Sequence, residues 1–145
     1  MILYLDASAL VKRYIAEKGS DQVNVWIGSA EVVVTALISR VEVAAAIARA
    51  RRMQMIQPRE ADAALHTFRS EWESFHRLPI TESTVARGDL LAVENQLKGY
   101  DATHLACALI WQEALGIPVT LATFYQQLSK SAVSNNLDVL PRSEG

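Results

Sequence analysis

The sequence predicts an α/β fold in which helices cover both faces of a central, mainly parallel sheet. Segments with strand character alternate with segments of helical periodicity along the chain, and this order is typical of parallel sheets. The first segment, residues 2–5, is an unbroken apolar run that stops at Asp6. Such a run is typical of a strand buried on both faces. The length of 145 residues suits a single domain spanning residues 1–145.

Four more strands are expected after the first. Residues 32–34 and 119–123 are rich in β-branched and aliphatic side chains, 75–80 is a weaker candidate that contains Pro79, and 137–140 is the last strand. Helical spacing of apolar residues places helices over residues 7–14, from about 22, from 39 to 52, and over 59–73, 81–98, 101–115 and 125–134.

The helix over residues 39–52 carries two sequence signals. Ser39 is a good N-cap residue. Val41, Ala44, Ala45 and Ala48 recur at i, i+3, i+4 and i+7, which predicts that they form the apolar face toward the sheet.

Composition excludes several classes of protein. The net charge of -2 shows no global basic field, although a local patch is enough to bind nucleic acid. The single cysteine, Cys107, lies in an apolar stretch, which predicts a buried thiol and no disulfide framework. Asp6 interrupts the N-terminal apolar run too early for a signal peptide, and no stretch suits a membrane span. A cytoplasmic protein is therefore expected.

Three acids fall at the starts of expected helices. Asp6 follows the first strand, Glu42 lies in the first turn after the second strand, and Asp101 opens a later helix. Helix starts in such a fold gather at one edge of the sheet, where ligands bind. Three carboxylates in a partly buried cleft repel one another, and a hard divalent cation such as Mg²⁺ or Mn²⁺ relieves the repulsion.

Each acid also has a purely structural interpretation. Asp6 and Asp101 are suitable N-cap residues. Residues 39–42 match a capping box, in which Glu42 would bond back to the amide of Ser39. Taken singly, the acids are explained by helix capping, and only their combination favours a metal site.

Three segments resemble the signature segments of the PIN-domain family, and within it the VapC-like toxins of toxin–antitoxin pairs. They are residues 5–12 (LDASALVK), 39–44 (SRVEVA) and 99–106 (GYDATHLA). The resemblance covers nearly the whole chain and implies an α/β/α fold and metal-dependent cleavage of RNA. It implies that Asp6, Glu42 and Asp101 are the catalytic metal-site acids and that Ser8 supports them by hydrogen bonding. It also implies an antitoxin partner and a homodimer.

One position departs from the family pattern. The segment 123–128 reads TFYQQL, and Tyr125 stands where the family often supplies a fourth acid. A neutral phenol is a poor ligand for Mg²⁺, whereas Thr123 could offer its hydroxyl to the site. A catalytically weak module that binds RNA or protein is therefore the alternative function. A phospho-acceptor receiver domain is disfavoured, because no second acid stands beside Asp6.

Three more residues have open interpretations. Lys12 and Arg13 follow the first acid and could contact RNA phosphate, or they could belong to a solvated helix face. His104 lies three residues after Asp101 on the same helix face. It is either a metal ligand or, as favoured here, a hydrogen-bonded structural histidine.

Overall fold

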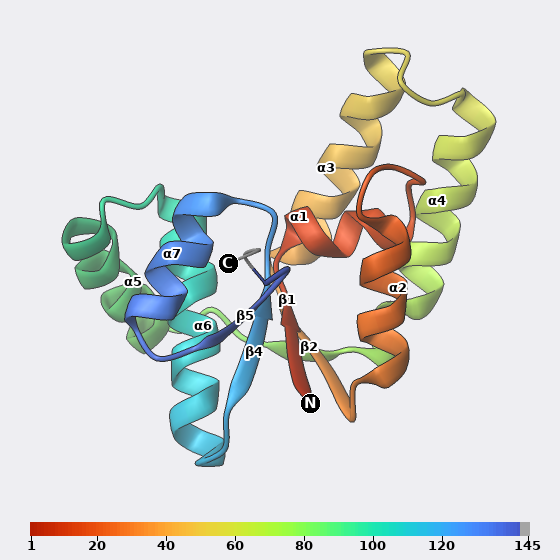
Figure 1. Cartoon of the computed structure of the whole chain (residues 1–145). Helices are drawn as coiled ribbons and strands as arrows, with labels where there is room; N and C mark the ends of the chain where they lie inside the picture. The colour runs from red at the N-terminus through yellow and green to blue at the C-terminus, as the bar shows by residue number, and fades with distance from the viewer. Residues whose placement is uncertain (143–145) are drawn as a thin grey trace.

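The structure is a computed structural model that describes residues 1–142. Its centre is a five-stranded sheet with the order β3-β2-β1-β4-β5, in which all four neighbouring pairs run parallel (Figure 1). The strands are β1 (Ile2–Leu5), β2 (Val32–Ala36), β3 (His76–Leu78), β4 (Val119–Ala122) and β5 (Asp138–Leu140). The predicted α/β class with a mainly parallel sheet is confirmed.

Helices cover both faces of this sheet. One layer holds α1 (Ala7–Leu10), the 3-10 turn η1 (Val11–Arg13), α2 (Ser20–Ser29), α3 (Ser39–Arg52) and α4 (Pro58–Glu71), which continues into η2 (Trp72–Ser74). The other layer holds α5 (Glu82–Asn95), α6 (Gly99–Leu115) and α7 (Gln126–Ser134). Figure 1 shows the two layers on opposite sides of the strands.

The central strand β1 divides the apolar core in two. Ile2 and Tyr4 pack with the core beside α5, α6 and α7, whereas Leu3 and Leu5 pack with the core beside α1, α3 and α4. This alternation follows from the strand period of two. All four β1 residues are buried, as predicted from the unbroken apolar run.

Local signals set several helix ends. Pro58 occupies the first turn of α4, and Gln57 and Glu60 form a capping box there. Thr81 caps α5 through its side chain. Gly116 ends α6 at φ +69°, a left-handed conformation that favours glycine.

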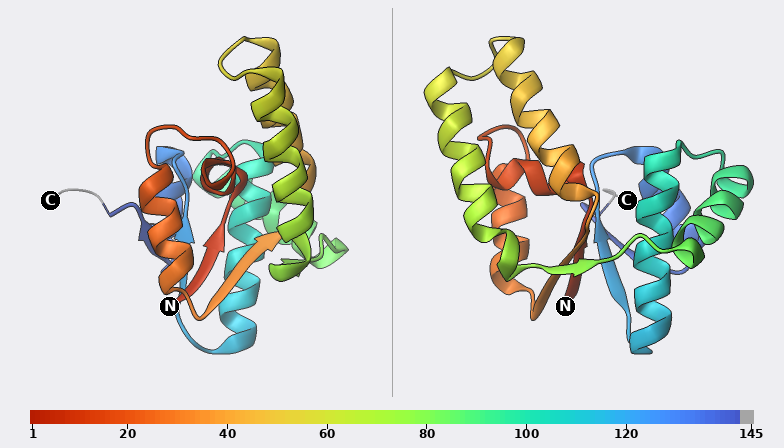
Figure 2. Two further views of the ribbon diagram at one scale, coloured as in Figure 1. Left: turned by 90° about the vertical axis from the view of Figure 1, so that its right-hand side faces the viewer. Right: turned by 180° about the vertical axis from the view of Figure 1, so that it is seen from behind.

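The predicted apolar face of α3 is wrong. The side chains that α3 buries are Ser39, Val43 and Ile47, whereas Val41 is 65% exposed. The alanines of α3 occur on every side of the helix, so their spacing does not define one apolar face. The larger side chains Val43 and Ile47 determine which side packs on the core. Figure 2 shows α3 and α4 as an antiparallel pair that projects beyond the carboxyl ends of the strands.

The topology places several chain segments at one edge of the sheet. Leu5 pairs with Ala122, so the residues that follow β1 and β4 are neighbours. Because α6 leads into β4 and runs opposite to the strands, its N-terminal end lies at this same carboxyl edge (Figure 1). Within residues 1–142, no helix is long and apolar enough to cross a membrane.

Candidate functional site

Asp6 lies at the carboxyl end of β1 and is 1% exposed. It is the N-cap of α1, because its Oδ1 accepts the Ala9 amide at 3.0 Å. The same oxygen accepts the Ser8 hydroxyl at 2.7 Å, and Oδ2 accepts the Thr123 hydroxyl at 2.6 Å. The capping interpretation of Asp6 therefore holds, and capping uses only part of the acceptor capacity of this carboxylate.

Ser8 and Thr123 connect α1 to the segment after β4. Ser8 Oγ accepts the Phe124 amide at 3.0 Å, and Thr123 Oγ1 accepts the Tyr125 amide at 3.1 Å. Both hydroxyls donate to Asp6 at the same time. The loop before α7 is thus fixed to the Asp6 carboxylate.

Glu42 does not form the capping box that the sequence suggests. The N-cap position of α3 is Ile38, which has no side-chain cap. Ser39 lies inside the helix, and the Thr35 hydroxyl lies 2.7 Å from both Ser39 Oγ and the Leu5 carbonyl oxygen. Held in this way, α3 directs Glu42 to His104, whose Nε2 lies 2.7 Å from Glu42 Oε1. The capping prediction is wrong because the tertiary partner replaces the local one.

His104 links Glu42 to the central strand. It is buried, and the Tyr4 hydroxyl lies 2.7 Å from its Nδ1. Burial raises the pKa of Tyr4 well above its ordinary value, so the phenol stays protonated. The His104 ring thus lies between a phenol and the Glu42 carboxylate. His104 is hydrogen-bonded as favoured from the sequence, but its partners, Tyr4 and Glu42, were not foreseen.

Asp101 is not an N-cap residue, contrary to the capping interpretation. The helix α6 begins two residues earlier at Gly99, and Lys98 occupies the N-cap position. Asp101 is 6% exposed, and its Oδ1 accepts no hydrogen bond from any residue that the structure describes. Burial raises the pKa of Asp101, and the charge of Asp6 raises it further. Lys98 and His104 oppose this shift, so the Asp101 side chain is a buried acid with nearby cations and one oxygen that lacks a hydrogen-bond donor among the described residues.

The electrostatics of the site combine burial with mutual repulsion. Burial raises the pKa of Asp6, although His104 and the hydrogen bonds from Thr123 and Ser8 oppose the shift. The charge of Glu42 is a further cause of the raised pKa of Asp101. The charges of Asp6 and Glu42 therefore both act on Asp101.

A test of metal fit gives two results. In chemical type, the oxygen donors and the orphaned Asp101 Oδ1 suit a hard divalent cation. In geometry, no three His, Cys, Asp or Glu side chains among residues 1–142 are arranged to hold a metal ion. Hydrogen bonds within the protein already occupy two of these acids. The Asp6 carboxylate accepts hydroxyl donors, and the Glu42 carboxylate lies against His104. The three acids therefore have the oxygen donors that a divalent cation prefers, but two of them are bonded to protein partners.

Tyr125 follows Thr123, whose hydroxyl accepts its amide and donates to Asp6. Its side chain is 46% exposed. The pKa of Tyr125 is raised by burial and next by the charge of Asp6. A neutral phenol therefore borders the acidic site.

Lys12 and Arg13 both have partners within the protein. Lys12 Nζ lies 3.1 Å from Glu17 Oε1 and 4.6 Å from the centre of the Phe124 ring. Arg13 Nε donates to Glu71 Oε2 at 2.7 Å. Contact with phosphate by either residue stays a prediction and would have to compete with these bonds.

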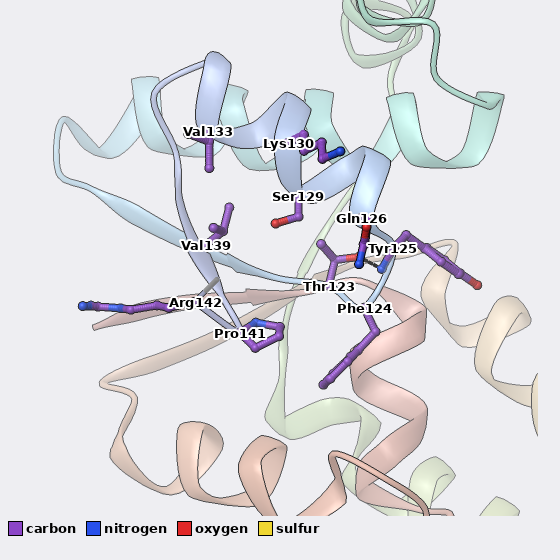
Figure 3. Close-up of a pocket in the computed structure, with 10 residues that line it drawn as sticks. All are labelled: Thr123, Phe124, Tyr125, Gln126, Ser129, Lys130, Val133, Val139, Pro141 and Arg142. Atoms are coloured by element: carbon purple, nitrogen blue, oxygen red, sulfur yellow. Dashed lines mark hydrogen bonds between the residues drawn. The ribbon is translucent and has the colours of Figure 1, made fainter. Parts of the chain in front are cut away.

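A pocket of about 610 Å³ lies beside the site, lined by residues of α7, by Val139 of β5 and by the segments around them (Figure 3). Thr123 and Tyr125 line it, but none of the three acids does. Lys130 and Arg142 are its cations. Because the Tyr125 side chain extends away from the other labelled residues in Figure 3, we treat the pocket and the acidic site as separate places.

A family model for the PIN domain matches residues 3–124. The chain belongs to the PIN-domain family. Ribonuclease VapC49 of Mycobacterium tuberculosis is 28% identical over 141 residues, which cover 97% of this chain and 95% of that protein.

Two solved structures have the same fold. A VapC20 toxin of Mycobacterium tuberculosis, described as cleaving the sarcin–ricin loop, gives a TM-score of 0.63 at 17% identity, over 89% of this chain and 94% of that chain. A toxin–antitoxin complex from Klebsiella pneumoniae gives 0.55 at 18% identity, over 83% of this chain and 84% of that chain. At these identities the two structures support the fold.

Proposed function

We propose that this protein is a Mg²⁺- or Mn²⁺-dependent endoribonuclease, the toxin of a toxin–antitoxin pair. The PIN-domain match and the similarity to proteins named Ribonuclease VapC support cleavage of RNA. The structural similarity to a toxin–antitoxin complex supports an antitoxin partner. A homodimer and a cytoplasmic location belong to the same proposal.

The observation that carries the metal site is the orphaned oxygen of Asp101. A buried carboxylate oxygen without a donor carries a free-energy cost. Asp6 raises that cost, since its charge acts on Asp101. Asp6 and Asp101, with Glu42 as the third acid, would hold a cation that would supply the missing contact and offset the repulsion.

The protein's own residues orient these ligands. Ser8, Thr123 and the Ala9 amide direct the oxygens of Asp6, and His104 directs Glu42. The chemistry that a divalent cation supplies in such a site is activation of water for attack on phosphorus and neutralisation of developing charge. Partners that orient a metal ligand are part of the site, since they set its position.

The test is cleavage of RNA by the purified chain without antitoxin. Total cellular RNA is incubated with Mg²⁺, with Mn²⁺ and with EDTA, beside an Asp6→Asn variant. Asparagine is also a good N-cap residue, so this variant keeps the α1 cap. We expect discrete products that require both metal and Asp6. Normal cleavage by Asp6→Asn would contradict the proposal.

The alternative is a catalytically weak module that acts by binding RNA or protein. Tyr125 in an acid position favours it, as does the absence of a converged metal-binding trio among residues 1–142. Tyr125→Asp separates the two functions. A large gain in metal affinity and cleavage would indicate a degenerate site, whereas an active wild type with no gain would show that three acids suffice.

A further inference from the structure

Two exposed tyrosines lie beside the buried acids. Tyr100 is the second residue of α6 and is 44% exposed, and Tyr125 directly precedes α7. Their ring centroids lie 6.3 Å apart with an angle of 59° between the ring planes. These residues are 25 positions apart in the sequence, so only the fold brings the two rings into contact.

Each tyrosine is tied to one of the acids. Tyr100 immediately precedes Asp101 in the first turn of α6. The Tyr125 amide donates to Thr123 Oγ1, which donates in turn to Asp6 Oδ2. The charges of Asp6, Asp101 and Glu42 all raise the pKa of Tyr125. The two rings therefore border the site where the acids meet.

The core does not explain these two rings. The neighbouring Phe124 stacks on Trp26 at 6.1 Å, and Tyr14 packs against Phe68 at 5.1 Å. Tyr100 and Tyr125 contact each other and keep nearly half of their surface exposed. Two exposed rings in contact offer flat faces on which an aromatic ligand can pack.

Positive charge lies close to the ring pair. Lys98, which precedes Tyr100 by two residues, is exposed, and its charge acts on the Asp101 carboxyl. Flat aromatic faces together with cations are the combination that binds single-stranded nucleic acid, by stacking its bases and pairing its phosphates.

We propose that Tyr100 and Tyr125 form a stacking platform for one unpaired base of the RNA, next to the phosphate that is cleaved. The proposal rests on the proposed function and names how that site holds its substrate. The two rings contact each other and their planes are inclined at 59°, so one base stacks on the outer face of one ring, packs against the other ring, and does not enter between them. Because every base has a flat face, the platform selects unpaired RNA over duplex and not one sequence.

The test measures binding of a fluorescent single-stranded RNA oligonucleotide in EDTA, by anisotropy. Tyr100→Leu and Tyr125→Leu should each weaken binding by about 5- to 150-fold, the range for loss of one stacked base. Tyr100→Phe and Tyr125→Phe should bind within about twofold of wild type, because they keep the ring. Leu90→Ala, an exposed apolar position on α5, is the matched control and should change nothing.

A second measurement tests the stacked base directly. One abasic position is moved along the oligonucleotide, and at one position wild-type affinity should fall by about the same factor as in Tyr125→Leu. The Tyr125→Leu variant should lose little more at that position, because the variant and the abasic site remove the same contact.

Several outcomes separate this proposal from the nuclease proposal. Wild-type binding by both leucine variants overturns the platform while metal-dependent cleavage still supports the nuclease. Loss of binding by these variants in a protein that never cleaves supports the platform and leaves the alternative binding function. Wild-type RNA binding together with weakened antitoxin binding would assign the ring pair to a protein partner and also overturn the platform.

Discussion

Two buried acids show two ways of keeping a carboxylate inside a protein. Asp6 accepts hydrogen bonds from Ser8, Ala9 and Thr123, which serve both of its oxygens. Asp101 leaves its Oδ1 without a donor from the described part of the chain. The protein therefore supplies the hydrogen-bond donors that Asp6 needs, whereas Asp101 Oδ1 needs a partner from outside the described chain.

The difference follows from where each acid sits relative to its helix. Asp6 is the N-cap of α1, where the side chain turns back to the free amides of the first turn. Asp101 is the third residue of α6, past the cap, and its first-turn neighbours are Gly99 and Tyr100. A buried carboxylate without a donor costs more folding free energy than a carboxylate that caps a helix. This cost favours a role for Asp101 in binding a cation.

The largest expected effect is one that the two acids share. We expect Asp6→Asn and Asp101→Asn each to slow Mg²⁺-dependent RNA cleavage by more than about 100-fold, because loss of a ligand exceeds the roughly 10- to 100-fold effect of an outer partner. The rate is measured on one defined oligonucleotide. Glu113→Gln, which removes an exposed partner of Arg87, is the control. Full activity in either Asn variant would remove that acid from the site.

A smaller effect is expected at the third acid. Tyr4→Phe removes the hydroxyl that holds the His104 ring in place beside Glu42 and should weaken Mg²⁺ affinity by about 10-fold or more, as outer partners of ligands do. Affinity is measured by calorimetry. Tyr14→Phe is the matched control, because it removes a phenol bond to Glu71 outside the three acids. Equal effects of the two variants would show that Tyr4 matters only for packing.

The third prediction separates the two acids by the sign of a stability change. In EDTA, Asp101→Asn should raise the free energy of unfolding by about 1 kcal/mol, because it removes a buried negative charge that Asp6 repels. Asp6→Asn should not raise it, since its carboxylate is already satisfied. Urea denaturation of both variants measures the difference. Destabilisation by Asp101→Asn would mean that Asp101 has an internal partner.

The smallest effect is a pH dependence of this stability difference. The pKa of Asp101 is raised above its ordinary 3.8 in the folded protein, so the folded state binds more protons than the unfolded state just above that value. Raising the pH through this window therefore destabilises the wild type relative to Asp101→Asn. Urea denaturation in EDTA across a pH series checks the sign. A difference that shrinks as the pH rises would contradict the raised pKa.

The local patterns of the sequence were sufficient for much of the fold. The apolar run at residues 2–5 predicted the central strand, and β1 has those bounds. Pro58 predicted the first turn of α4, which begins there. Such signals depend on neighbours a few residues apart, so they survive in the folded chain. The predicted apolar face of the alanine-rich helix α3 was wrong, because the spacing of its alanines did not distinguish one face from another.

The placement of the candidate site depended on long-range contacts. The sequence by itself determined which residues carry acids and that Asp6 ends a buried strand. Only the tertiary structure decided that Thr123 donates to Asp6, that Glu42 pairs with His104 and not with its own helix, and that Tyr100 meets Tyr125. These contacts join positions 25 to 117 residues apart, and strand order and helix packing set them, so no local spacing in the chain encodes them.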